Sequence, residues 1–421
     1  MSPESRKPVL VIGGGIAGLT AAVELADAGC AVILVEKSPT LGGQVARMHQ
    51  YFPKLCPPAC GLEMHLRRIR ESDSIIVHTL AEATQIDGSA GDYQATVRID
   101  PRYVSEGCTA CGDCVKPCPV KRKDEFNYGL TVTRAAYLPG GIAYPARYVV
   151  DRKSCAKGCR ACEEACRYGA VKLDDQVEWK RYGVSAIVAA TGWQPYDAKR
   201  LGNLGFGTCA NVVTNVVLER MAASGGPTGG SILRPSDGKP PRTVAFVQCA
   251  GSRDENHLPY CSAVCCGASI KQAAYIRALY PETSITVFYI DLRTPGRIEE
   301  FQTGIVSAAN VKLVKGKVAK VEQNPATGDL LVTAEDSLSG RKETWQFELV
   351  VLATGMVPRT QGLPSGFTLD EFGFITSEDG RSGLYGAGCV RRPEDVSACV
   401  RNATAAALQA YQCAQRSERH A

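Results

Sequence analysis

Residues 8–18 read PVLVIGGGIAG, a short apolar run that ends in closely spaced glycines. A helical pattern follows over residues 19–28, and a second apolar run over 31–35 ends at Glu36. This order predicts a βαβ unit in which the glycines let the backbone approach a pyrophosphate at the start of the helix. Glu36, 18 residues after Gly18, is expected to accept hydrogen bonds from an adenosine ribose. The stretch therefore predicts a dinucleotide-binding domain.

The composition of the whole chain is that of an ordinary folded protein. Its 421 residues fit two or three domains, with 45% hydrophobic and 22% charged residues. The net charge of +5 is small for this length and argues against a nucleic-acid partner. The sequence shows neither a signal-peptide core nor an apolar run long enough to cross a bilayer. We expect a cytoplasmic protein whose association with the inner membrane would run through partner subunits.

Two parts of the chain share one pattern, a β-meander followed by an apolar strand and an Ala-Thr-Gly turn. The first copy ends at residues 186–192 and the second at 349–355. From the matching aspartate to the threonine, the first copy spans 99 positions and the second 25, so the first holds a 74-residue insertion. The pattern predicts an α/β, thioredoxin-reductase-like flavoprotein with two nucleotide-domain units. The predicted parts are an FAD-binding domain at 1–100, 180–205 and 345–421, an inserted two-cluster ferredoxin-like domain at 101–179, and a second Rossmann-like domain at 206–344.

The second unit is predicted to lack a phosphate-binding glycine loop. Its strand at 243–248, helix at 269–279 and strand at 284–290 form another βαβ pattern. Where a glycine-rich turn should follow the first strand, residues 249–254 read CAGSRD. Without those glycines the backbone cannot close on a pyrophosphate, so we expect no direct reduction by NAD(P)H.

Nineteen cysteines, an odd number in tight spacings, indicate metal or redox chemistry in a reducing compartment. Eight form two runs inside the insertion, and the first run has bacterial ferredoxin spacing with a proline after its last cysteine. In a two-cluster ferredoxin the first three cysteines of a run hold one 4Fe–4S cluster and the fourth holds the other. One predicted cluster therefore uses Cys108, Cys111, Cys114 and Cys166, and its neighbour uses Cys155, Cys159, Cys162 and Cys118. A structural zinc ribbon is the alternative.

Two further cysteine groups leave alternatives open. One group fits either a third cluster or a redox disulfide with buried free thiols; it comprises Cys249, Cys261, Cys265 and Cys266. Cys56 and Cys60 fit either a redox-active disulfide beside the flavin or a packed loop that lines its pocket.

The candidate cofactor-binding residues come from the first βαβ unit and from three later turns. In flavoproteins of this type, the segment near Gly388 brings a helix N-terminus toward the flavin and its ribityl chain. An aspartate usually follows that glycine, whereas this chain has Cys389. The sequence identifies no catalytic acid or base. The candidates are Gly13, Gly15, Ala17, Gly18, Glu36, Lys37, Gly43, Gln44, Thr191, Gly192, Gly388 and Cys389.

The order of these motifs resembles the heterodisulfide reductase A family over nearly the whole chain. The resemblance rests on LGGQ at 41–44, the segment around Cys56 and Cys60, the inserted cysteine runs, VQCAGSRD at 247–254 and YCSAVCC at 260–266. It implies FAD, two 4Fe–4S clusters in the insertion, and a third on the group that begins at Cys249. Two stretches, YFPKLCPP at 51–58 and residues 249–260, look most like the A subunits of quinone-interacting membrane-bound oxidoreductases of sulfate reducers.

The narrower resemblance implies an electron-transfer subunit in dissimilatory sulfate reduction. Its expected partners are a second flavin/iron–sulfur subunit plus a membrane haem/quinone subunit, with electrons passing between the menaquinone pool and adenylylsulfate reductase. The alternatives are a heterodisulfide-reductase-type electron-transfer or bifurcating subunit, and an NAD(P)H-dependent disulfide reductase that uses Cys56 and Cys60. A non-catalytic scaffold with structural zinc is a further alternative.

Overall fold

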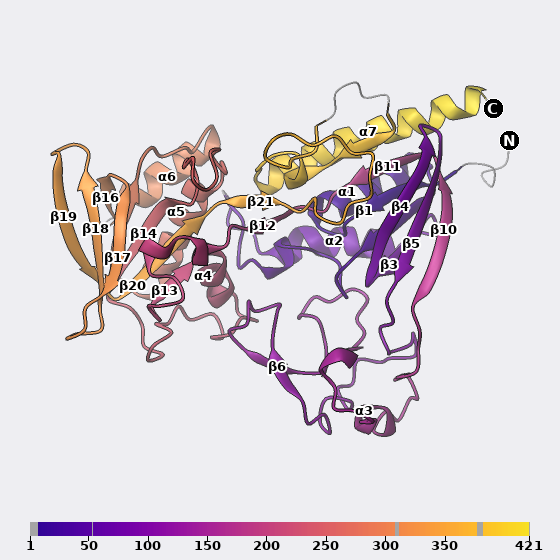
Figure 1. Ribbon diagram of the computed structural model, residues 1–421, viewed down its shortest axis with the longest axis horizontal. Coiled ribbons are helices and arrows are strands. Elements are labelled where there is room, and N and C mark those ends of the chain that lie inside the picture. Colours follow the sequence, from indigo (N-terminus) through magenta and orange to yellow (C-terminus); the bar gives the residue numbers. More distant parts are fainter. Residues whose placement is uncertain (1–6, 53, 308–310, 377–381, 421) are drawn as a thin grey trace.

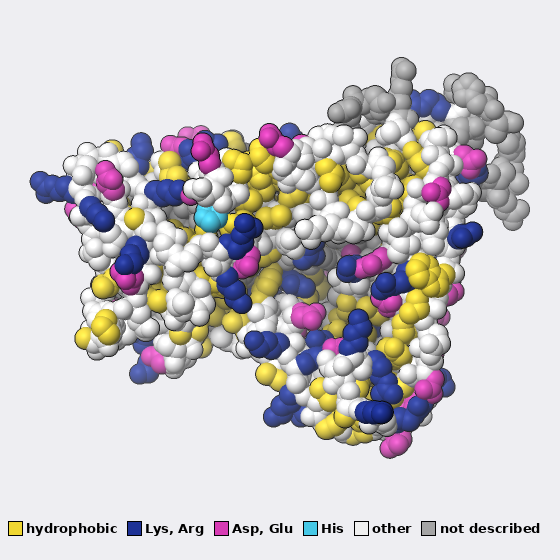
Figure 2. Space-filling view, in the orientation of Figure 1, with side chains coloured by type: hydrophobic (Ala, Val, Ile, Leu, Met, Phe, Trp, Pro, Cys, Tyr) yellow, Lys and Arg dark blue, Asp and Glu magenta, His cyan; other side chains and the backbone are white. Residues whose placement is uncertain are grey.

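The computed structural model describes residues 7–52, 54–307, 311–376 and 382–420. The predictions that fall on other residues, including Pro53 and the first six residues of the FAD domain, lie outside this range. Figure 1 shows two α/β lobes side by side and a small lobe below the first, made by the chain between β5 (Asp92–Ile99) and β10 (Glu178–Val184). Figure 2 shows many Lys and Arg side chains on the visible face of the small lobe.

The first α/β lobe is built on a five-stranded parallel sheet. Its strand order is β22-β11-β1-β2-β3. The strands are β1 (Val9–Ile12), β2 (Val32–Glu36), β3 (Ile75–Thr79), β11 (Ala186–Ala189) and β22 (Leu384–Gly386). Helices α1 (Ile16–Asp27), α2 (Pro58–Glu71) and α7 (Val396–His420) cover one face. The antiparallel strands β4 (Ala81–Ser89), β5 and β10 cover the other.

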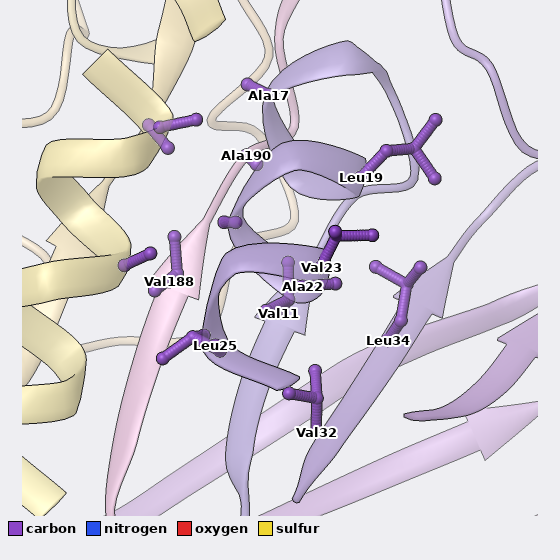
Figure 3. Close-up of a cluster of buried hydrophobic side chains, with 14 of the residues drawn as sticks. Val11, Ala17, Leu19, Ala22, Val23, Leu25, Val32, Leu34, Val188 and Ala190 are labelled. Carbon is purple, nitrogen blue, oxygen red and sulfur yellow. The ribbon is translucent and has the colours of Figure 1, made fainter. Parts of the chain in front are cut away.

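The core of this lobe explains why residues 8–12 form a fully buried strand. Successive side chains of a strand point to opposite faces, so Val9 and Val11 pack against the helices while Leu10 packs against the antiparallel strands. Figure 3 shows Val11, Leu34 and Val188 beneath α1. Fully burying each such side chain stabilises the fold by about 1.5–3 kcal/mol. This packing holds the Gly13–Gly15 turn at the carboxyl edge of the sheet.

The second α/β lobe repeats the plan of the first. Its parallel sheet has the order β13-β20-β14-β15-β16, and an antiparallel sheet β17-β18-β19 lies beside it. The parallel strands are β13 (Val212–Thr214), β14 (Thr243–Ala250), β15 (Ser284–Tyr289), β16 (Val311–Lys315) and β20 (Leu349–Thr354). The antiparallel strands are β17 (Val318–Gln323), β18 (Leu330–Asp336) and β19 (Arg341–Phe347), and the helices are α4 (Asn215–Ala222), α5 (Cys265–Leu279) and α6 (Arg297–Ser307). The predicted internal repeat is confirmed.

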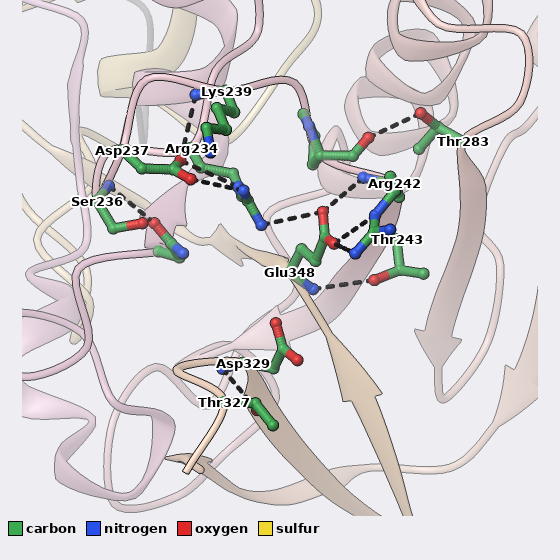
Figure 4. Close-up of polar contacts among 12 residues, drawn as sticks. Arg234, Ser236, Asp237, Lys239, Arg242, Thr243, Thr283, Thr327, Asp329 and Glu348 are labelled. Carbon is green, nitrogen blue, oxygen red and sulfur yellow. Dashed lines mark hydrogen bonds and ion pairs between the residues drawn. The ribbon is translucent and has the colours of Figure 1, made fainter. Parts of the chain in front are cut away.

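A buried carboxylate anchors the Gly- and Pro-rich segment 224–241 to this lobe. Glu348, with a side chain 8% exposed, pairs with Arg234 at 3.2 Å and with Arg242 at 2.8 Å (Figure 4). Arg234 also pairs with Asp237 at 2.6 Å within the segment. The two arginines compensate the buried charge, and the segment is thereby held against the start of β14.

The insertion forms the small lobe and contains little regular structure. Its elements are β6 (Lys121–Lys123), β7 (Val132–Arg134), β8 (Ala136–Tyr137), β9 (Val149–Val150) and α3 (Ala161–Glu164). Its core is a cluster in which cysteines pack with small apolar side chains, among them Val104, Cys114 and Cys162. The insertion thus buries its cysteines together.

The two α/β lobes are joined by an antiparallel pair of short strands, β12 (Trp193–Pro195) and β21 (Met356–Pro358). The sequence placed the return to the first lobe at residue 345, but β20 pairs with β13 and β14 in the second sheet. The crossing therefore comes after Thr354. The sequence misplaced it because β20 and its turn share their pattern with β11, which belongs to the first sheet.

Candidate flavin cavity and cysteine clusters

A cavity of about 1420 Å³ lies where the three lobes meet. Gly15 and Glu36 line it from the first lobe, Asn215 and Lys271 from the second, and Tyr128 from the small lobe. All of the predicted cofactor-binding residues line this cavity except Gly18 and Gly388. The fold therefore brings residues that are far apart in the sequence to one site.

The glycines of the first turn have distinct roles. Gly13 has φ +109°, and a Cβ there would lie 2.4 Å from the Ala190 carbonyl oxygen, so the turn requires glycine. A Cβ on Gly18 would lie 1.8 Å from the Gly13 carbonyl oxygen, so this glycine lets α1 pack onto the turn. A Cβ on Gly15 would meet only the Gly43 Cα, at 3.8 Å. The space beside Gly15 is open to a ligand.

The start of α1 fits the pyrophosphate of a dinucleotide. The helix begins directly after Gly15, and its first turn contains no acidic residue. The first N–H groups of a helix lack partners within the helix and carry partial positive charge, which suits an anion. Open space beside Gly15 and this helix end together fit FAD in the cavity.

Glu36 ends β2 beside the glycine turn. Its Oε2 accepts a hydrogen bond from the Gly14 N–H at 2.6 Å, and its Oε1 accepts one from the Ser38 N–H at 2.6 Å. A carboxylate oxygen has two lone pairs, so each retains an acceptor position for a ribose hydroxyl. Lys37 points outward and pairs with Glu82 at 2.5 Å.

Backbone contacts hold the opposite wall in place. The Thr191 hydroxyl donates to the Arg359 carbonyl oxygen at 2.6 Å, and the Arg359 N–H donates to the Gly192 carbonyl oxygen at 3.0 Å. Gln44 Nε2 donates to the Trp193 carbonyl oxygen at 3.5 Å. These contacts join the glycine-rich segment 41–44 to the two crossing strands.

A loop of the small lobe reaches into the cavity, which the sequence did not predict. The guanidinium of Arg47 lies 5.4 Å from the ring centre of Phe126 and 5.2 Å from that of Tyr128. Arg220 lies 4.9 Å from the Phe126 ring. The Tyr128 hydroxyl donates to Gln44 Oε1 at 3.0 Å. These contacts link all three lobes, so no local sequence pattern could reveal them.

A buried ion pair, also missed from the sequence, forms part of the cavity wall. Lys271 of α5 and Glu219 of α4 are 3.0 Å apart, with side chains 4% and 7% exposed. Lys271 Nζ also donates to the Gln50 carbonyl oxygen at 2.6 Å. Burial acts to raise the pKa of Glu219, but Lys271 and hydrogen bonds from Gln272 and the Gln50 amide outweigh it, and the pKa is lowered. A lysine inside the otherwise apolar pattern of α5 was the available signal.

The first four predicted cluster cysteines surround a small cavity of about 20 Å³ in the small lobe. Cys108, Cys111, Cys114 and Cys166 all line it. Burial, with Cys108 nearby, raises the pKa of the Cys114 thiol to about 12. The arrangement brings the fourth cysteine of the second run to the first three cysteines of the first run.

The other four predicted cysteines of the small lobe also lie together. Burial raises the pKa of the Cys162 thiol, and Cys155, Cys118 and Cys159 add to the effect. Cys155 in turn feels Cys118 and Cys159. Cys118, from the first run, therefore lies among three cysteines of the second run.

The group that begins at Cys249 takes the place of a phosphate-binding loop between β14 and α5. Cys249 ends the strand with φ +55°, and Cys265 and Cys266 are the first residues of α5. Burial raises the pKa of the Cys265 thiol, and Cys266, Cys249 and Cys261 raise it further. A Cβ on Gly251 would lie 2.8 Å from the Tyr196 ring, so this glycine serves packing.

The chemistry of these three groups fits iron–sulfur clusters. Buried thiols that raise one another's pKa resist ionisation, and a bound cation reverses that effect because a coordinating thiol is deprotonated outright. Within the described residues, no three Cys, His, Asp or Glu side chains converge closely enough to hold a single metal ion. A 4Fe–4S cube takes one thiolate at each of four irons, so its ligands stand further apart than those of one ion.

Cys56 and Cys60 lie at the start of α2, Cys56 half-buried and Cys60 exposed. Among the described residues that line the flavin cavity, Tyr51 and Phe52 come from this loop, whereas neither cysteine does. The structure thus separates the two thiols from the cavity wall.

Comparisons with known proteins define the class. A family model described as FAD dependent oxidoreductase matches residues 8–68. Thioredoxin reductase of Lactococcus lactis superimposes with a TM-score of 0.54 at 14% identity, covering 98% of this chain and 100% of that one. Thioredoxin reductase of T. acidophilum gives 0.52 at 16% identity, covering 96% and 98%. The chain is an oxidoreductase with FAD as its cofactor and a thioredoxin-reductase-like fold, as predicted from the sequence.

Homologues over most of the chain are A subunits of heterodisulfide reductases. That of the H(2):CoB-CoM heterodisulfide,ferredoxin reductase of Methanothermobacter marburgensis is 37% identical over 95% of this chain and 63% of its own length. That of the ferredoxin/F(420)H(2)-dependent CoB-CoM heterodisulfide reductase of Methanosarcina acetivorans is 36% identical over 97% of this chain and 53% of its own. The chain thus spans less than two thirds of the length of these curated relatives.

The narrower predictions are not shown by these comparisons. The relatives are named for heterodisulfide reduction and not for the quinone-interacting complex of sulfate reducers. Among the described helices, none is both long enough and apolar enough to span a membrane.

Proposed function

We propose that the chain is the FAD- and iron–sulfur-bearing electron-transfer subunit of a heterodisulfide-reductase-type complex. The observation that carries this proposal is the cavity shared by the three lobes, where the glycine turn of the first lobe meets the Tyr128 loop of the small lobe. FAD exchanges electrons singly or in pairs, whereas a 4Fe–4S cluster carries one at a time. A chain that holds both converts between the two.

The chain's own residues bind and orient the cofactors in this proposal. Gly15 and the start of α1 would hold the FAD pyrophosphate, and Glu36 would hold the ribose. The eight cysteines of the small lobe would hold two 4Fe–4S clusters, and Phe126 and Tyr128 anchor that lobe to the FAD cavity. The group at Cys249, Cys261, Cys265 and Cys266 would hold a third cluster.

Electrons would pass through protein partners and not through NAD(P)H. The turn after β14 carries cysteines where a dinucleotide-binding domain has its glycine loop, and Gly251 packs against Tyr196. The homologues are subunits of complexes, which supports further subunits for this chain. The domain division also stays a proposal, with the FAD domain now rejoined at β21 and not at residue 345.

A second candidate is the role in sulfate reduction implied by YFPKLCPP and residues 249–260. In that case the partners would be a second flavin/iron–sulfur subunit plus a membrane haem/quinone subunit, with adenylylsulfate reductase as electron partner. Membrane association would run through those subunits. The comparisons favour the heterodisulfide-reductase type.

An anaerobic optical titration of the purified holoprotein tests the proposal. Reduced ferredoxin is expected to bleach the flavin and cluster bands together, because the cofactors exchange electrons within one chain. NADH and NADPH are expected to bleach neither. Flavin bleaching by NADPH alone would overturn the proposal in favour of a pyridine-nucleotide-dependent disulfide reductase. Flavin reduction without any cluster signal would also overturn it.

A further inference from the structure

Two cysteines outside all of the predicted cluster groups meet in the wall of the flavin cavity. The Sγ atoms of Cys389 and Cys399 are 3.4 Å apart. Both side chains are buried, with 6% and 5% of the residue exposed, and both residues line the cavity. Cys389 lies in the short helical turn η6 (Gly388–Val390), and Cys399 lies in the first turn of α7. Cys399 was not singled out from the sequence.

The backbone on either side holds the two thiols together. The Gly388 N–H donates to the Asn402 side-chain oxygen at 2.8 Å, which ties the turn to α7. A Cβ on Gly388 would lie 2.8 Å from the Cβ of Ala17, so the turn is pressed against α1. At the other end, Asp395 accepts the Ala398 N–H at 2.8 Å and fixes the start of α7. Neither cysteine needs a large backbone movement to approach the other.

The environment makes the two thiols chemically unequal. A hydrogen bond from the Cys399 thiol lowers the pKa of Cys389, whereas the same contact raises the pKa of Cys399. The start of α7 adds positive potential at this place. The carboxylates of Glu394 and Asp395 act in the opposite direction. The thiolate is the reactive form of cysteine, so an unequal pair of this kind suits disulfide chemistry.

We propose that Cys389 and Cys399 are a redox-active dithiol that exchanges an electron pair with FAD in this cavity. In the oxidising direction the two S–H bonds break and one S–S bond forms. The two electrons and two protons pass to the flavin, which becomes fully reduced. The reverse step opens the disulfide and returns the flavin to its oxidised form. The inference goes beyond the electron-relay function, because it needs the FAD cavity but no iron–sulfur cluster.

The proposal assigns to this pair the role that the sequence offered to Cys56 and Cys60. Cys389 and Cys399 line the cavity, whereas Cys56 and Cys60 do not. The pair would give the site a two-electron store beside the flavin. A complex that meets two-electron and one-electron partners could then hold a pair while clusters carry single electrons away.

Peptide mapping of the wild-type holoprotein tests the proposal without any variant. Trypsin cuts after Arg391 and thus places the two cysteines on separate peptides, residues 382–391 and 392–401. Anaerobic samples with oxidised and with fully reduced flavin are quenched in acid, alkylated and digested. We expect the disulfide-linked peptide pair in the oxidised sample and two alkylated peptides in the reduced one. Two alkylated peptides in both samples, or a linked pair in both, would overturn the proposal.

A reductive titration of variants provides the second measurement. Wild-type protein is expected to consume about two more electrons per chain than Cys399→Ala, because a disulfide is a two-electron couple. Cys413→Ala is the matched control, since Cys413 is also a buried cysteine of α7 but does not line the cavity. It should match the wild type. Equal electron uptake by wild type and a folded, FAD-loaded Cys399→Ala would overturn the proposal.

Discussion

Glu219 Oε2 and Lys271 Nζ lie 3.0 Å apart inside the wall of the flavin cavity, although the residues come from different helices. The Glu219 carboxylate also accepts the backbone N–H groups of His49 and Gln50 at 3.0 and 3.2 Å. One buried charge pair thus joins α4, α5 and the loop before α2. Removing one partner leaves the other charge buried without compensation, which is far more costly than losing a surface pair.

Lys271→Met is therefore expected to destabilise the protein by about 3–5 kcal/mol. The control is Lys320→Met, which removes an exposed partner of Glu322 and should cost less than about 1 kcal/mol. Thermal melting of the FAD-loaded proteins measures the difference. Similar melting temperatures for the two variants would show that the buried pair does not hold the lobes together.

The same pair predicts how stability depends on pH. The pKa of Glu219 is lowered in the folded protein from its ordinary value of 4.5, because Lys271 and hydrogen bonds outweigh the cost of burial. A depressed carboxyl pKa contributes stability that is present above pH 4.5 and is lost as the pH falls through the folded-state value. Glu219→Gln should be less stable than the wild type at pH 7, and the gap should narrow below pH 4.5. Melting curves that stay equally far apart on either side of pH 4.5 would contradict this assignment.

Gly15→Ala should weaken FAD binding while leaving the fold intact. The added methyl group has only the Gly43 Cα nearby, at 3.8 Å, and Gly15 has φ −78°, which alanine adopts readily. The methyl would instead occupy the space through which the pyrophosphate approaches the backbone. We expect at least a tenfold rise in the Kd for FAD, about 1.4 kcal/mol. Gly202→Ala, at another open position away from the cavity, is the control for reconstitution measured by flavin fluorescence.

Phe126→Ala should loosen the small lobe from the flavin cavity. The variant removes the ring that Arg47 and Arg220 both contact, and cation–π contacts contribute about 0.5–2 kcal/mol each. Hydrogen exchange over residues 120–135 should accelerate. Tyr168→Ala changes an aromatic residue of the same lobe that is 53% exposed, and exchange there should stay at the wild-type rate. Unchanged exchange in Phe126→Ala would mean that other contacts hold the lobe.

Local patterns in the sequence predicted the elements that contact only their neighbours. The run at 8–12, the glycine turn and Glu36 form one βαβ unit because adjacent residues specify it. The grouping of Cys166 with the first cysteine run followed from the known chain pattern of ferredoxins. Lys271, Phe126 and Cys399 were missed because their partners lie in other lobes or turns.

The misplaced crossing at residue 345 has a related cause. β20 and β11 have the same apolar pattern and the same Ala-Thr-Gly turn, so the sequence alone does not say to which sheet each belongs. Strand pairing with β13 and β14 decides it. Gly251 is similar, since only its contact with Tyr196 shows that this glycine serves packing in place of phosphate binding.

Counting iron, acid-labile sulfide and FAD in anaerobically purified protein tests the central claim most directly. Three 4Fe–4S clusters predict about twelve irons and about twelve sulfides for about one FAD per chain. Cys261→Ala should lose about four of those irons, whereas Cys413→Ala should keep them all. A Cys261→Ala variant that retains about twelve irons would contradict the third cluster. Zinc in place of iron, without sulfide, would contradict the whole account.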